Sequence, residues 1–229
     1  MSLEREPAEG VTEPVFLRAE ILPGRGFNTY QLRAHLPSRG EVSLFTAPLL
    51  EEALTFMNGG PDDFYGNRSF TVGGAILVPY ANRIRGKYLE AEKAIETAIA
   101  GKMVRLPANW RGKQPTAEWH AMHGLILDQA LSDIALTSRH GPDGHATVSG
   151  RLAAGDFRGH WLSKMELEFS ATLREKTFEF AVIAKNVGTE PAPVGIGWHP
   201  YFELPGGNRE VARLHVPARR RAVAGSVPG

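Results

Sequence analysis

Apolar and polar residues alternate along several stretches of the chain. Residues 30–36 alternate strictly, as expected for a strand with one face in water. Residues 164–173 place apolar side chains at every second position, and the pattern resumes at residues 178–184 after a short charged turn. The last two stretches therefore predict an antiparallel hairpin.

Shorter apolar runs between Gly/Pro turn signals predict further strands, over residues 42–45, 75–78, 125–127, 146–152, 194–198 and 211–216. Residues 90–100 fit a helix face, whereas residues 97–106 fit a hairpin with a Gly-Lys turn; the β-rich surroundings favour the hairpin. Residues 49–57 fit either a helical turn or a loop edge. The chain is thus predicted to be all-β, a large antiparallel β-sandwich formed by one domain over residues 15–229, preceded by a flexible leader at 1–14.

Charge and cysteine content narrow the function. The 229 residues carry a formal net charge of +1 with acids and bases intermixed, so no nucleic-acid partner is expected. The chain has no cysteine, which excludes disulfides and thiolate metal sites. Its eight histidines show no metal-ligand spacing, so no metal is expected. No signal peptide or membrane span is recognised, so a cytoplasmic protein without membrane partners is the expectation.

The sequence GIGWHPYFELPGG, residues 195–207, combines a histidine with aromatic residues. Pro200 has no N–H, so the strand leading to it is expected to end or bend there. His199 then lies at a strand end, flanked by Trp198, Tyr201 and Phe202. Flat apolar rings suit the C–H faces of a pyranose, and an imidazole can exchange a proton. The alternative is a histidine packed among aromatic residues at a hydrophobic strand end.

Two other positions have similar contexts. His123 is followed directly by a glycine at the predicted start of a strand, where it serves either in a site or as a turn residue. Arg83 follows Asn82 in a loop at another predicted strand end. Its guanidinium suits vicinal hydroxyls or a carboxylate, and the alternative is a surface ion pair.

The segments GGAILVPYANRI, MHGL and GWHPYFELPGG, in this order, resemble the aldose 1-epimerase (galactose mutarotase-like) family over roughly residues 22–217. The resemblance implies a β-sandwich with a sugar cleft, no cofactor and a small-molecule sugar substrate. Asn82 and Arg83 match the substrate-contacting loop, and Trp198 and Tyr201 are expected to contact the sugar beside them. His123 matches the residue that holds the sugar, and His199 matches the general acid of anomer interconversion.

The sequence departs from the family pattern in one respect. Family members supply a glutamate base from sequence well beyond the HPYF strand, but no acidic residue follows Glu210 here. The sandwich is therefore expected to be C-terminally short. Two alternatives to an aldose 1-epimerase remain: a carbohydrate-binding β-sandwich without the base, and a sugar-phosphate 1-epimerase that uses Arg85 and Lys87 beyond Arg83.

Overall fold

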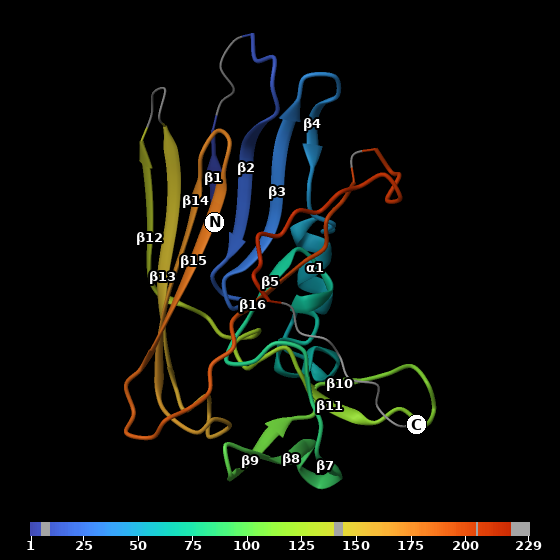
Figure 1. The fold of residues 1–229 in the computed structure, drawn as a ribbon, viewed down its shortest axis with the longest axis vertical. Coiled ribbons are helices and arrows are strands. Elements are labelled where there is room, and N and C mark those ends of the chain that lie inside the picture. Colours follow the sequence, from blue (N-terminus) through green and yellow to red (C-terminus); the bar gives the residue numbers. More distant parts are fainter. Residues whose placement is uncertain (6–9, 140–143, 205, 221–229) are drawn as a thin grey trace.

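The structure is a computed structural model that describes residues 1–5, 10–139, 144–204 and 206–220. One sheet has the strand order β1-β2-β3-β5-β16, and β4 also pairs with β3. Its strands are β1 (Ser2–Glu4), β2 (Val15–Leu22), β3 (Asn28–Leu36), β4 (Gly40–Ser43), β5 (Gly74–Leu77) and β16 (Gly197–Pro200). A second sheet, β12-β13-β14-β15, forms the facing layer (Figure 1). Its strands are β12 (Ser132–Arg139), β13 (His145–Gly155), β14 (Met165–Leu173) and β15 (Phe178–Asn186).

Two small sheets lie beyond the ends of these layers (Figure 1). One has the order β10-β11-β6 and the other β7-β8-β9. Their strands are β6 (Arg83–Ile84), β7 (Lys87–Leu89), β8 (Ala94–Ile99), β9 (Lys102–Pro107), β10 (Trp110–Arg111) and β11 (Trp119–Met122). The helical segments are α1 (Leu50–Phe56) and the 3-10 helices η1 (Pro61–Gly66), η2 (Ser69–Thr71) and η3 (Glu90–Glu92). In the described part of the chain, no helix is long and apolar enough to cross a membrane.

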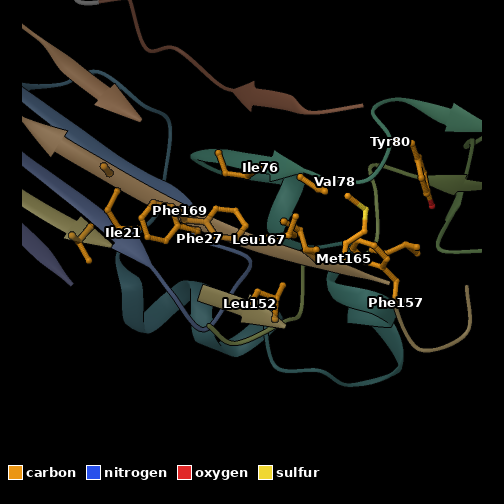
Figure 2. Close-up of a cluster of buried hydrophobic side chains, with 14 of the residues drawn as sticks. Ile21, Phe27, Ile76, Val78, Tyr80, Leu152, Phe157, Met165, Leu167 and Phe169 are labelled. Carbon is orange, nitrogen blue, oxygen red and sulfur yellow. The ribbon is translucent and has the colours of Figure 1, made fainter. Parts of the chain in front are cut away.

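The main hydrophobic core fills the space between the two large sheets. Alternate residues of β14, including Leu167 and Phe169, point inward, as their burial pattern shows. The ring centroids of Phe27 and Phe169 are 5.3 Å apart, and Ile76 of β5 belongs to the same cluster (Figure 2). The antiparallel β-sandwich predicted from the alternating pattern is confirmed.

Individual elements differ in how well the pattern predicts them. The hairpin favoured near residues 97–106 is present as β8 and β9, and the β14–β15 hairpin has a continuous antiparallel register. Residues 125–127 are buried without forming a strand, and residues 211–216 form no strand and are exposed. Those two predictions are wrong, because an apolar run becomes a strand only where successive residues pair with a neighbouring strand.

The beginning of the chain also differs from the prediction. Residues 2–4 form β1, which pairs with β2, and Leu3 is fully buried in the main core. A flexible leader is therefore wrong for these residues, because the Leu3 side chain fills a core position and β1 satisfies one edge of β2. The middle of the predicted leader, residues 6–9, lies outside the described residues.

Candidate active site

The strand β16 carries His199 at the edge of the first sheet. It pairs with β5 so that His199 lies opposite Ala75 and Trp198 lies opposite Ile76. Successive side chains of a strand point to opposite faces, so the imidazole and the indole are directed apart. Ala75 belongs to a small apolar cluster outside the sandwich, whereas Ile76 belongs to the main core. We call the side of β5 and β16 that carries Ala75 and His199 the site face.

His123 reaches the same place from a tight turn after β11. Its φ is +63°, and its N–H donates to the Asn82 carbonyl at 3.0 Å. Gly124 follows with a φ of +84°, and a Cβ there would lie 2.4 Å from the Val78 carbonyl oxygen. Only glycine fits that approach, which brings the turn against the end of β5.

The two imidazoles form the centre of the site. Their ring centroids are 4.7 Å apart at an interplanar angle of 61°. Phe70 meets His123 edge-on at 4.8 Å, and Tyr201 lies 5.1 Å from His199. The Nδ1 atoms of both histidines are buried and have no hydrogen-bond partner within the described residues. An unsatisfied buried polar atom costs about 1–3 kcal/mol, so this arrangement favours a ligand that supplies the missing partners.

The electrostatic surroundings distinguish His123. Burial lowers its pKa to about 4, and the positive charges of His199 and Arg83 contribute to that lowering. The imidazole is therefore neutral near pH 7, able to donate from one nitrogen and accept at the other. Within the described residues, the charged groups that shift this pKa are cationic, and no carboxylate is among them.

Arg83 and Asn82 join the site in different ways. Arg83 begins β6, where it pairs with Met122, the residue before His123. Its guanidinium lies 5.5 Å from the ring centroid of Trp110 and is exposed. Asn82 has a φ of +62° and contacts His123 through its backbone carbonyl. The structure thus brings His123, His199, Arg83 and the Asn82 backbone together, as the resemblance implies.

Trp198 and Tyr201, the two aromatic residues expected to contact the sugar, lie in different surroundings. The Trp198 indole N–H donates to the Thr29 hydroxyl at 2.9 Å, and its ring lies 5.0 Å from Phe180 in the sandwich interior. The structure therefore separates Trp198 from the histidine pair. Tyr201 stays beside His199 with 40% of its surface exposed, which leaves it accessible to a ligand.

Asn109 supports the site and has no assigned role in the sequence analysis. Its side-chain oxygen accepts from the Met122 N–H at 2.7 Å, and its amide donates to the Met122 carbonyl at 3.0 Å. The amide therefore holds the residue that precedes His123. The signal in the sequence is a polar residue between Ala108 and Trp110, but its partner lies 13 positions away.

A buried ion pair fixes the segment that carries Phe70. One guanidinium nitrogen of Arg25 donates to both carboxylate oxygens of Asp63, at 2.8 and 2.9 Å, while its Nε donates to the Ser69 hydroxyl. The Asp63 side chain is fully buried, so removing either charge would leave the other without a partner. This contact holds η1 and η2 together and sets the position of the Phe70 ring against His123.

A cleft of about 660 Å³ lies beside the Phe70 ring that contacts His123. We call it the basic cleft, because its walls include four cationic side chains, Arg68, Lys93, Arg111 and Lys113. Phe70 and Trp110 line it as well, and these rings also contact His123 and Arg83. In the described part of the chain, no group of three or more histidine or acidic side chains is placed to hold a metal ion.

Comparison with known proteins identifies the fold and the family. The chain is similar in fold to the crystal structure of galactose 1-epimerase from Lactobacillus acidophilus, with 16% sequence identity and a TM-score of 0.50. The match covers 91% of this chain and 54% of the other, so the chain spans about half the length of that structure. No functionally curated protein sequence matches significantly. Residues 50–220 match the sequence profile of the aldose 1-epimerase family, and the chain belongs to that family.

Proposed function

We propose that the histidine pair binds a free aldose and promotes interconversion of its α and β anomers. The observation that carries the proposal is the pair of imidazoles 4.7 Å apart, each with a buried and unsatisfied Nδ1, beside the Arg83 guanidinium. A sugar ring offers hydroxyl groups that donate and accept, which matches two neutral or exchangeable imidazoles and a cation. Membership of the aldose 1-epimerase family supports the same substrate class.

Anomer interconversion requires the sugar ring to open. A base takes the proton of the C1 hydroxyl while an acid protonates the ring oxygen, the C1–C2 bond rotates, and the ring closes from the other face. We assign the acid to His199, whose imidazole is only partly buried. His123, neutral at pH 7, holds a sugar hydroxyl by a hydrogen bond, and Arg83 and Tyr201 bound the sugar on its open side.

The base is not assigned to a residue in this proposal. Glu203, the acid closest to His199 in sequence, is exposed, and its backbone N–H donates to the Leu44 carbonyl. The cationic surroundings of His123 favour, as the second candidate, a sugar-binding protein without catalysis. Binding and catalysis therefore need separate measurements.

Polarimetry on freshly dissolved α-galactose and α-glucose tests the proposal, with sugar binding followed by calorimetry. The expected result is acceleration over buffer that falls by about 10²–10⁴-fold in His199→Asn, since a positioned acid contributes about that much. His35→Asn, near the end of β3 where His35 pairs with Val15 and Glu41, is the matched control and is expected to keep full activity. Binding without acceleration would establish the second candidate instead.

A further inference from the structure

The basic cleft has an unusual charge balance for a surface of this protein. Asp62 is the acidic residue that lines it, against the four cations. Elsewhere, several basic side chains pair with carboxylates, as Arg105 does with Glu92 and Glu96. Within the described residues, none of the four cleft cations forms an ion pair with a carboxylate. Their charge is therefore available to an anion from solution.

The two arginines of the cleft are held in place by neutral groups. Arg111 donates from Nε to the Ala117 carbonyl at 2.8 Å and from one terminal nitrogen to the Pro115 carbonyl at 2.7 Å. Arg68 donates from Nε to the Asp62 carbonyl at 2.8 Å. Carbonyl partners fix the guanidinium without neutralising its charge, so less conformational entropy is lost when an anion binds.

The cleft also lies next to the proposed sugar site. Phe70 lines the cleft and contacts His123, and Trp110 lines it beneath the Arg83 guanidinium. Tyr88 and Trp119, stacked at 5.5 Å, form a further part of the wall. The cleft and the histidine pair are therefore neighbours that share the Phe70 wall, so a ligand longer than one sugar ring can contact both.

We propose that the basic cleft binds the anionic group of an acidic saccharide whose reducing-end ring lies at the histidine pair, an inference that rests on the proposed function. The volume of about 660 Å³ lies within the range of about 300–1,000 Å³ typical of small-molecule sites and exceeds the need of a lone phosphate. The aromatic wall suits a second sugar ring, and the cations suit its carboxylate or phosphate.

The cations named for a phosphate in the sequence analysis are not the ones in the cleft. Arg85 donates to Glu118 from two nitrogens, at 2.6 and 3.0 Å, so its charge is already compensated. Lys87 does not line the cleft either. We therefore assign the anion site to the four cations of the basic cleft, Arg68, Lys93, Arg111 and Lys113.

Calorimetric titration at low ionic strength tests the proposal with digalacturonate and its neutral counterpart, galactobiose. Digalacturonate is expected to bind at least about tenfold more tightly, because it adds charge-assisted hydrogen bonds. The double variant Lys93→Gln, Lys113→Gln is expected to lose at least about fivefold of that preference. These lysines have no side-chain hydrogen bond within the described residues, so the fold should be unaffected.

The matched control is Lys164→Gln, Lys185→Gln, which removes the same charge from exposed positions at the second sheet. It is expected to keep the full preference. Equal affinity for the acidic and neutral disaccharides, or the same loss in both double variants, would overturn the proposal. Inorganic phosphate binding as tightly as digalacturonate would also overturn it.

A second arm distinguishes the source of the anion. Glucose 6-phosphate binding that weakens in Lys93→Gln, Lys113→Gln would support the proposal and place the anionic group on the hexose itself. Polarimetry on the unmodified chain separates this inference from the proposed function. A preference for the acidic sugar in an unmodified chain that does not accelerate anomer interconversion retains the cleft assignment and rejects the enzyme.

Discussion

Neighbouring residues on the two faces of β16 differ in whether their polar atoms are hydrogen-bonded. On the core face, the Trp198 N–H is satisfied by Thr29 and the indole packs among aromatic rings. On the site face, His199 keeps a buried nitrogen without a partner among the described residues. The difference indicates that the core face contributes stability, while the site face keeps hydrogen-bonding capacity for a ligand.

Removing the core-face side chain should have the largest effect on stability. Trp198→Ala deletes the indole and leaves the Thr29 hydroxyl without its donor, so the free energy of unfolding is expected to fall by about 3 kcal/mol. Urea unfolding measures this change in the free energy of unfolding. His199→Ala, at the next position, is expected to change the free energy of unfolding by less than about 1 kcal/mol. Equal losses at both positions would contradict the difference between the two faces.

A smaller loss is expected for the residue that supports the site face. Asn109→Ala leaves both backbone groups of the buried Met122 without their partners, at an expected cost of about 2 kcal/mol. Sugar binding should weaken as well, because Met122 positions His123. Calorimetry at a temperature where the variant remains folded separates the two effects. Unchanged stability would show that water replaces the amide.

The lowered pKa of His123, on the site face, predicts that the free energy of unfolding depends on pH. Burial lowers this pKa from 6.5 to about 4. Between these two pH values, the imidazole is protonated in the unfolded chain and neutral in the folded chain. This contribution to stability is present above pH 6.5 and is lost as the pH falls towards 4. After allowance for solvent around the open site, the loss is about 1–2 kcal/mol. Urea unfolding at pH 7 and pH 4.5 measures it, and His123→Gln should remove that part of the slope.

The smallest effect is expected where the site meets water. Tyr201→Ala should change the free energy of unfolding by less than about 1 kcal/mol, because the ring is 40% exposed. Binding of an aldose should nevertheless weaken several-fold, since the ring beside His199 bounds the open side of the sugar. Phe202→Ala is the control, because the Phe202 ring lies 5.9 Å from Trp198. If Tyr201→Ala weakens aldose binding no more than Phe202→Ala does, Tyr201 has no role in binding.

Local patterns predict much of the fold because alternation reports which face is buried. The β14–β15 hairpin follows from residues that are close in sequence. By contrast, the strand expected at residues 211–216 fails and the strand at Leu3 is missed, since both depend on a partner that the local pattern does not show. Local pattern alone does not establish where such partners lie.

The candidate site is predicted in part for the same reason. The resemblance to the family predicts a shared site for residues 83, 123 and 199. The structure brings these residues together, and their roles in the site stay predictions. The separation of Trp198 from His199 follows from the two-residue period of a strand, which the sequence analysis did not apply to that pair. The contact of Asn109 with Met122 depends on tertiary packing, so a polar residue at position 109 does not by itself show it. The same holds for the four cations of the cleft, which form no ion pair within the described residues.

The short pairing of β16 with β5 has a consequence for how this protein tolerates change in length. Adding or deleting one residue just before Gly197 would turn the imidazole inward and the indole outward, because the register is fixed by Gly74 and Ala75 opposite. Such an indel would remove the indole from the core and the imidazole from the site face at once. Natural variation in this segment should therefore occur by substitution rather than by insertion or deletion.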